Sequence, residues 1–175
     1  MIIKTERLFL RELTYEDFDA LNAVLADSDI MEHYPHTFDE ARVRNWISRN
    51  MERYQKDGFG LWAVVLKKTG EMIGDCGITM QKIHGHLLPE IGYHIRKDQQ
   101  RRGYASEAAA ACIRYAFKKL DFQEVYSYMK YTNIPSQRTA MKNGMRFVEE
   151  YKDPDNTYTR VFSINRKEWE KQHET

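Results

Sequence analysis

The sequence has little cysteine and lacks any long apolar run. Cys76 and Cys112 are the two cysteines among 175 residues, and each lies in an apolar context. Two such residues make neither a disulfide framework nor a metal site, so we expect buried thiols in a reducing compartment. No apolar run approaches the roughly 20 residues that a membrane span needs, and residues 1–7 carry charge where a secretory signal would be apolar. We therefore expect a cytoplasmic protein without membrane attachment.

A net charge of one sign is also lacking. The chain has 27 Lys and Arg against 26 Asp and Glu, which excludes the bulk basic field typical of nucleic-acid-binding proteins. Hydrophobic residues make up 42% and charged residues 30%, as in ordinary soluble globular proteins. The length suits one well-packed domain better than two. We predict a single domain over residues 1–175.

Strand and helix periodicities follow one another along the chain. The order is strand, two helices, three strands, helix, strand, helix and two strands, with a short helix around Trp169. This mixture predicts one α/β (or α+β) sheet domain with helices on both faces. The predicted strands are 7–13, 59–66, 72–80, 87–95, 125–131, 146–151 and 157–164. Of the predicted helices, the first starts at Thr14 and the second at a capping box from Thr37 to Glu40. Two further helices are predicted over 105–120 and 135–142.

The junction before the alanine-rich helix has the features of an anion site. A helix N-terminus leaves backbone N–H groups unpaired and carries partial positive charge. Gly103 allows close approach of the backbone, Ala105 and Ser106 leave the first turn unobstructed, and Arg101 and Arg102 add charge. These features predict a phosphate site, with a merely solvated loop as the alternative. The spacings of a Walker loop and of a three-glycine dinucleotide fingerprint are both missing.

Residues 100–105 have the pattern Gln-x-x-Gly-x-Ala, which resembles the acetyl-CoA loop of the GNAT superfamily of N-acetyltransferases. The matches extend from residue 5 to about 165 and keep the family's order. The segments that resemble the RimJ/RimL-like branch are 5–11, 90–93, 103–108, 133–136 and 143–147, the last with two residues between its glycine and Phe147.

The resemblance implies a single-domain, mixed, mostly antiparallel sheet whose fourth and fifth strands splay apart. It implies acetyl-CoA as the acetyl donor and no metal. The pantetheine arm is expected beside His94 and Ile95 of the fourth strand, with Asn133 on the far side of the opening and Gly92 at a bulge that starts the splay. The implied pyrophosphate loop consists of Gln100, Arg101, Arg102, Gly103, Tyr104, Ala105 and Ser106.

The remaining chemistry is attack by a neutral amine on a thioester, which requires a base. Glu90 is our candidate, on the same predicted strand face as His94, and a structural hydrogen-bond acceptor is the alternative. The departing thiolate needs a donor. Many GNAT enzymes use a tyrosine seven residues after the asparagine, but Ala140 occupies that position. Ser136 is our candidate donor, and Tyr131 is the alternative.

Histidines occur in two loops. His33, Tyr34 and His36 lie between the first two helices, where family members build the acceptor pocket, so we expect them to bind substrate. Solvated loop residues are the alternative. His84 and His86 lack the third ligand that a zinc site needs.

These observations predict an acetyl-CoA-dependent N-acetyltransferase. It would acetylate a primary amine, of a protein N-terminus or a small molecule, by direct attack in a ternary complex. A non-catalytic acetyl-CoA-binding module is the alternative, because the usual tyrosine is missing at Ala140. Nucleic-acid binding through Arg101 and Arg102, with the tyrosines of 126–131, ranks third, since strand tyrosines commonly pack within sheets. We expect no nucleic-acid partner, and a homodimer, which is common among relatives.

Overall fold

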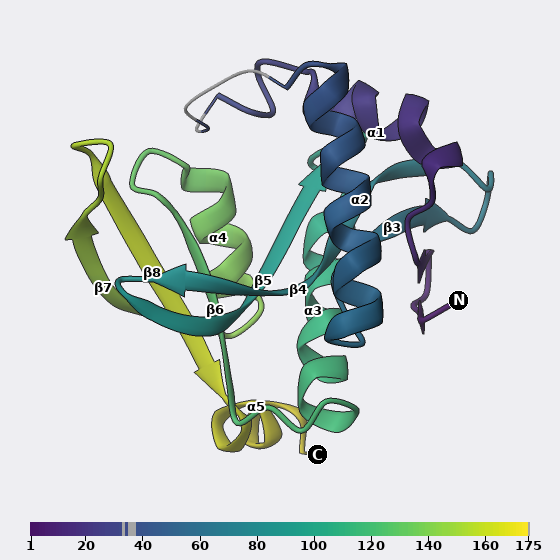
Figure 1. The fold of residues 1–175 in the computed structure, drawn as a ribbon. Helices are drawn as coiled ribbons and strands as arrows, with labels where there is room; N and C mark the ends of the chain where they lie inside the picture. Colours follow the sequence, from purple (N-terminus) through teal and green to yellow (C-terminus); the bar gives the residue numbers. More distant parts are fainter. Residues whose placement is uncertain (33, 35–37, 175) are drawn as a thin grey trace.

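The computed structural model describes residues 1–32, 34 and 38–174, and its strands form one eight-stranded sheet (Figure 1). The strand order is β1-β2-β3-β4-β5-β6-β8-β7, and every neighbouring pair is antiparallel except β5 and β6. The strands are β1 (Ile3–Lys4), β2 (Leu8–Arg11), β3 (Leu61–Leu66), β4 (Met72–Ile83), β5 (His86–Ile95), β6 (Glu124–Lys130), β7 (Arg146–Lys152) and β8 (Tyr158–Asn165). The helices are α1 (Phe18–Leu25), α2 (Glu40–Lys56), α3 (Tyr104–Lys118), α4 (Ile134–Lys142) and α5 (Arg166–His173).

Helices cover both faces of the sheet, as the sequence predicts. α1 packs on β4 and on α2, whereas α3 packs on the other side of β4 and β5, next to α4. The predicted mixed, mostly antiparallel architecture is therefore confirmed. The first helical segment starts where predicted, with Thr14 as its N-cap and Glu16 and Asp17 in its first turn, whereas the start of the second helix differs from prediction. The segment from Tyr15 to Asp17 forms a 3-10 turn ahead of α1, and the cap of α2 is Asp39, whose side chain accepts from the Arg42 N–H. Thr37, the predicted cap, lies outside the described residues.

The β4–β5 hairpin is longer and tighter than predicted. Its turn consists of His84 and Gly85, both with positive φ (47° and 83°), which is the conformation that a two-residue type I′ turn requires. The loop predicted around these residues is therefore a minimal turn. The hairpin keeps a regular register from Ile83–His86 to Gly74–Ile95.

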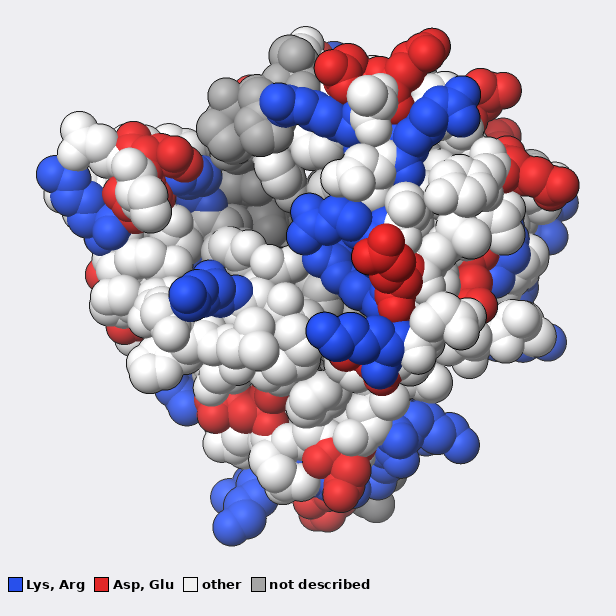
Figure 2. Space-filling view, in the orientation of Figure 1, with Lys and Arg blue, Asp and Glu red and all other residues white. Residues whose placement is uncertain are grey.

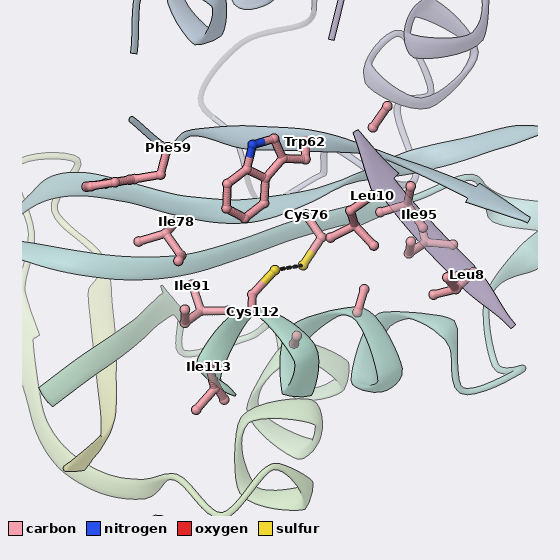
Figure 3. Packing of buried hydrophobic residues seen from close by; sticks show 14 of the residues in the cluster. Leu8, Leu10, Phe59, Trp62, Cys76, Ile78, Ile91, Ile95, Cys112 and Ile113 are labelled. Atoms are coloured by element: carbon pink, nitrogen blue, oxygen red, sulfur yellow. Dashed lines mark hydrogen bonds between the residues drawn. The ribbon is translucent and has the colours of Figure 1, made fainter. Parts of the chain in front are cut away.

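The core lies between the central strands and the small-residue face of α3. Cys76 of β4 and Cys112 of α3 are both fully buried, with their sulfur atoms 3.7 Å apart (Figure 3). Both are free thiols, as expected. Burial raises the pKa of the Cys76 thiol. Alanines at 108, 109 and 116 let the α3 backbone approach the sheet closely.

The V-shaped opening predicted between the fourth and fifth main strands is present between β5 and β6. The two strands pair in parallel at Glu90 and Tyr126 and then diverge, with α4 following β6 on the far arm (Figure 1). The Ser127 hydroxyl donates to the Ile91 carbonyl at 2.9 Å and closes the base of the opening. We refer to this opening as the V. The bulge expected at Gly92 is absent from the described β4–β5 pairing, where Gly92 faces Gly77 in regular register.

Within the described residues, the helices are too short or too polar to cross a bilayer.

Candidate active site

The predicted anion loop takes the conformation that an anion site requires. After a 3-10 turn over Lys97–Gln99, Arg101 and Gly103 both have positive φ, at 62° and 85°. Gly103 stands at the N-cap of α3 and has no side chain to occupy its first turn. The Gln100 side chain turns back and donates to the Ile95 carbonyl at 2.9 Å. The loop therefore presents the start of a 15-residue helix at the open end of β5.

The N-terminal segment of the chain holds this loop in place. The Arg7 guanidinium bonds the Glu107 carboxylate at 2.7 Å and the Arg102 carbonyl at 2.9 Å, and it lies 4.4 Å from the Tyr104 ring centre. Thr5 also donates to Glu107, at 2.6 Å. Burial alone would raise the pKa of Glu107, but hydrogen bonds from Thr5 and Arg7 lower it. Glu107 thus supports the loop from the first turn of α3.

Along β5, alternate residues direct their backbone N–H and C=O groups toward the V. The Arg96 N–H donates to Ile73 of β4, and hydrogen-bonded pairs alternate along an antiparallel ladder. His94 therefore pairs with Asp75 of β4, whereas Tyr93 and Ile95 direct their peptide groups toward the V. Of the two residues predicted beside the pantetheine arm, Ile95 has this geometry. The peptide of His94 is turned toward β4 instead.

The Glu90 carboxyl is a buried acid at the base of the V. Its Oε2 is buried and has no hydrogen-bond partner within the described part of the chain. Burial, opposed by Arg53 of α2 and reinforced by Asp75, raises the pKa of Glu90 from 4.5 to about 8. The carboxyl lies over Gly92, where a side-chain carbon would come within 2.9 Å of Oε2. Gly92 therefore makes room for Glu90 and does not bend the strand as predicted.

Because folding raises its pKa, Glu90 is expected to cost stability at alkaline pH. Between pH 4.5 and about 8 the folded state holds a proton on Glu90 that the unfolded chain has lost. The free energy of unfolding therefore falls as pH rises through this window. Glu90→Gln removes the titration, so at pH 8.5 the variant should be more stable than the unmodified protein by on the order of 2–4 kcal/mol. Urea unfolding measured from pH 5 to 8.5 checks this, and a stability difference that does not grow with pH would contradict it.

On the opposite face of the sheet, a hydroxyl pair bridges the two arms of the V. The Tyr93 hydroxyl of β5 lies 3.1 Å from Ser136 Oγ in α4. Burial raises the pKa of Tyr93 to about 12, so its hydroxyl stays protonated at neutral pH. Asn133 caps α4 by accepting from the Ser136 N–H at 3.3 Å, and Ala140 is buried. Tyr131 is 43% exposed on the loop between β6 and α4.

A polar chain crosses the face of the sheet that carries Glu90. Both carboxylate oxygens of the fully buried Asp75 are used: one lies 2.8 Å from His94 Nδ1, and the other accepts from the Trp46 indole at 2.8 Å. The other ring nitrogen of His94 lies 2.7 Å from the Tyr34 hydroxyl. The predicted residues His94 and Tyr34 are thus brought together. His33 and His36, also predicted to bind substrate, lie outside the described residues.

Sequence reasoning missed Asp75, Trp46, Arg53 and Tyr93. Asp75 left a signal, because it is the one carboxylate in the otherwise apolar and glycine-containing run from Met72 to Met80. A charge in a strand that is buried on both faces needs partners, and these come from α2 and β5. Trp46 and Tyr93 left no signal beyond that of ordinary core aromatics.

Among the described residues, no group of three or more His, Cys, Asp or Glu side chains could hold a metal ion. His84 instead lies 3.0 Å from Glu149 and stacks on Tyr151, with ring centres 4.3 Å apart. These contacts tie the β4–β5 turn to β7.

Comparison with known proteins agrees with this geometry. Residues 7–146 match the acetyltransferase (GNAT) domain family. Among curated proteins, the chain is 35% identical to the uncharacterized protein YkkB of Bacillus subtilis over 82% of this chain and 84% of that one. It is 33% identical to the uncharacterized N-acetyltransferase YnaD of the same organism, over 83% of each.

Solved structures give the same assignment. A GNAT-family acetyltransferase from Bacillus anthracis is 29% identical and superposes with a TM-score of 0.82, over 94% of this chain and 98% of that one. The fold also matches that of RimL, a ribosomal L7/L12 N-terminal acetyltransferase in complex with coenzyme A, at 17% identity and a TM-score of 0.78, over 94% and 97% of the two chains. The chain belongs to the GNAT family of acetyltransferases, which transfer acetyl groups from acetyl-CoA.

Proposed function

We propose that this acetyltransferase transfers the acetyl group to a primary amine, of a protein N-terminus or a small molecule, by direct attack in a ternary complex. The observation that carries the proposal is the position of Glu90. Glu90, whose Oε2 is buried and has no hydrogen-bond partner among the described residues, lies at the base of the V, and the anion loop lies at its open end. Donor loop and base are therefore both placed along β5, one at each end of the V.

The residues of the V and the loop fit acetyl-CoA. Gly103, with its positive φ and bare N-cap, leaves room for a pyrophosphate against the first turn of α3. The outward peptide groups of Tyr93 and Ile95 suit the amides of the pantetheine arm, and one of their N–H groups would polarise the thioester carbonyl. Asn133 faces them from the other arm. The proposed donor site comprises Ile95, Gln100, Arg101, Arg102, Gly103, Tyr104, Ala105, Ser106 and Asn133, with Tyr93 in place of His94, whose peptide pairs with β4.

Glu90 is the proposed base for the acceptor. A primary amine is protonated at neutral pH and must lose a proton before it can attack. The raised pKa of Glu90, about 8, makes its carboxylate a much stronger base than an exposed glutamate. Arg53 and Asp75 tune this value in opposite directions. An ammonium group entering the pocket would favour the ionised carboxylate and pass its proton to it.

Ser136 is the proposed donor to the departing thiolate. Its hydroxyl is paired with the Tyr93 hydroxyl at 3.1 Å, next to the strand edge that would hold the thioester. The pair supplies a hydrogen bond where Ala140 replaces the family's tyrosine. Tyr131, the other candidate, belongs to an exposed loop, and the contact between Ser136 and Tyr93 favours Ser136.

The acceptor class is proposed from the RimJ/RimL-like segments and from charge. Lys and Arg side chains gather along α2, the helix that carries Arg53, on the face shown in Figure 2. Arg53 lies within electrostatic reach of Glu90, and the exposed Arg49 adjoins it one turn earlier. The Arg53 guanidinium near the base, with Arg49 next to Arg53, favours acceptors that carry a carboxylate near the amine, such as acidic protein N-termini.

Release of free thiol from acetyl-CoA tests the function. The assay uses a panel of acceptors: N-terminal peptides starting with acidic or basic residues, amino acids, polyamines and aminoglycosides. We expect amine-dependent release, with acidic peptides preferred, and mass spectrometry should find one added acetyl group on the acceptor. Acetyl-CoA binding without turnover against the whole panel would overturn the proposal and support the non-catalytic binding module, which Ala140 keeps as the second candidate.

A further inference from the structure

Four aromatic rings form a closed cluster over the outer end of β5. Tyr34 packs on Phe38, Phe38 on Trp46, Trp46 on His94 and His94 again on Tyr34, with ring centres 5.3 to 5.9 Å apart. The rings come from the segment between α1 and α2, from α2 and from β5. Such edge-to-face contacts are favourable and orient the rings. The Tyr34 hydroxyl is thereby directed at the imidazole of His94.

The polar atoms of this cluster form one directed chain of hydrogen bonds. The Trp46 indole can only donate, and it gives its N–H to Asp75. The other carboxylate oxygen of Asp75 lies 2.8 Å from His94 Nδ1, which assigns the ring proton to Nδ1. His94 Nε2 is then the acceptor, and the Tyr34 hydroxyl donates to it across 2.7 Å. Asp75 is 0% exposed and the His94 side chain 11%, so water competes little for these bonds.

This chain ends on the same side of β5 as Glu90. Glu90, Gly92 and His94 share one strand face, which places Glu90 and His94 about 13 Å apart along the strand. The pKa of Tyr34 is raised, first by burial of its hydroxyl end and then by the carboxylates of Glu90 and Asp75. Tyr34 as a whole residue is 39% exposed. The Tyr34 hydroxyl therefore lies within electrostatic reach of both acids and stays protonated in the resting protein.

A protonated primary amine loses two protons from its nitrogen when it is acetylated. The first leaves the ammonium group before attack, and in the proposed function Glu90 accepts it. The second leaves the nitrogen as the amide forms, when the protonated Glu90 can no longer act as a base. Building on that function, we propose that Asp75, His94 and Tyr34 form a proton relay that takes the second proton from the acceptor nitrogen.

The step balances within the named atoms. The nitrogen lone pair forms the N–C bond to the thioester carbon, and the electron pair of the C–S bond leaves with the sulfur of coenzyme A. The proton of the nitrogen passes to the Tyr34 oxygen while Tyr34 passes its own proton to His94 Nε2. His94 becomes an imidazolium ion paired with the Asp75 carboxylate. Tyr34 is the catalytic residue of the three, and His94 and Asp75 act through it.

Two substitutions probe the relay with little change of shape. Tyr34→Phe keeps the ring in the cluster and removes the hydroxyl. Asp75→Asn keeps a hydrogen bond to His94 but places an amide donor beside Nδ1, which moves the ring proton to Nε2 and blocks acceptance from Tyr34. Tyr15→Phe, the same change at an exposed tyrosine (52%), is the matched control. Among the described residues, the charged and titratable groups facing His94 and Tyr34 are Asp75 of β4, Glu90 of β5, Tyr128 of β6 and, through Glu90, Arg53 of α2.

The expected result is a fall in kcat of about 10²-fold for Tyr34→Phe and for Asp75→Asn, with the KM for acetyl-CoA unchanged. The double variant should be no slower than the slower single variant, because both substitutions break one relay. Tyr15→Phe should match the unmodified enzyme. In the ¹⁵N spectrum of labelled imidazoles, His94 should be protonated at Nδ1 in the unmodified protein and at Nε2 in Asp75→Asn.

Other outcomes overturn the relay, alone or together with the proposed function. Tyr34→Phe with kcat within about twofold of the control, or losses that multiply in the double variant, would mean independent packing roles. A His94 protonated at Nε2 in the unmodified protein would overturn the relay whether or not turnover is measured. If the unmodified enzyme transfers acetyl to no amine, the proposed function fails and the relay fails with it. Turnover with an unaffected Tyr34→Phe variant overturns the relay alone.

Discussion

Gly103→Glu is expected to weaken acetyl-CoA binding by more than about 100-fold, which corresponds to about 3 kcal/mol. The glutamate would put a carboxylate at the first turn of α3, where the pyrophosphate is proposed to bind. It also meets two obstacles in the protein itself. Gly103 has φ 85°, a conformation that costs a residue with a side chain roughly 1–2 kcal/mol, and its new Cβ would come within 3.2 Å of the Arg7 guanidinium. Isothermal titration with acetyl-CoA measures the effect.

Gly85→Glu is the matched control for this substitution. Gly85 has φ 83°, and no atom lies within 4 Å of the position that its new Cβ would take, so the backbone cost and the added charge are the same as at 103. It lies in the β4–β5 turn, away from the loop. We expect Gly85→Glu to bind acetyl-CoA like the unmodified protein. Equal affinities of the two glutamate variants would refute the placement of the pyrophosphate at Gly103.

Glu90→Gln is expected to lower kcat by about 10²–10³-fold while acetyl-CoA affinity stays the same. Glutamine keeps the size of the side chain and cannot accept a proton. The sign of the pH dependence follows from the pKa of about 8. The active form of Glu90 is the carboxylate, so the rate of the unmodified enzyme should rise with pH up to about 8 and then level off. The variant should lack this rise. Steady-state rates from pH 6 to 9.5, at saturating acetyl-CoA, measure both effects.

Glu12→Gln serves as the control, since Glu12 is an exposed carboxylate on the segment after β2. We expect its rate and pH profile to equal those of the unmodified enzyme. A Glu90→Gln variant that keeps the rise toward pH 8 would remove Glu90 as the base and leave it a structural residue. The stability gain predicted for the same variant at alkaline pH is independent of turnover, so it shows separately whether the carboxyl titrates as the geometry implies.

The proposed donor half of the site could be derived from the sequence because its residues are close together in the chain. The anion loop occupies seven consecutive residues, 100–106, and its glycine, small residues and arginines each have a role that needs no knowledge of the rest of the fold. The splay of β5 and β6 came from the family resemblance, and the one residue pair that the structure records between them, Glu90 and Tyr126, agrees with it. Glu90 was found through the same resemblance, but its burial, and hence its raised pKa, depends on α2 and could not be read from β5 alone.

The proposed proton relay could not be predicted as a unit, although His94 and Tyr34 were each expected at the site, because it is assembled from distant segments. Asp75, His94, Trp46 and Tyr34 come from two strands, a helix and a loop, and their contacts exist only when α2 packs across β4 and β5. Gly92 shows the same limit in a single residue. A glycine inside a strand is equally compatible with a β-bulge and with the close approach of another group to the backbone. At Gly92 the structure shows the second, because the Glu90 carboxyl occupies the space that a side chain would need.

The contacts that Thr5 and Arg7 make with the proposed donor loop bear on how the chain could be split into two fragments. Thr5 and Arg7 contact Glu107, about 100 residues further on, and the β4–β5 turn at His84 and Gly85 lies between them. Two fragments separated at that turn would each carry one side of the contact that shapes the loop. Cofactor capture would then require both fragments together, which makes this turn a natural division point for a split reporter of protein association.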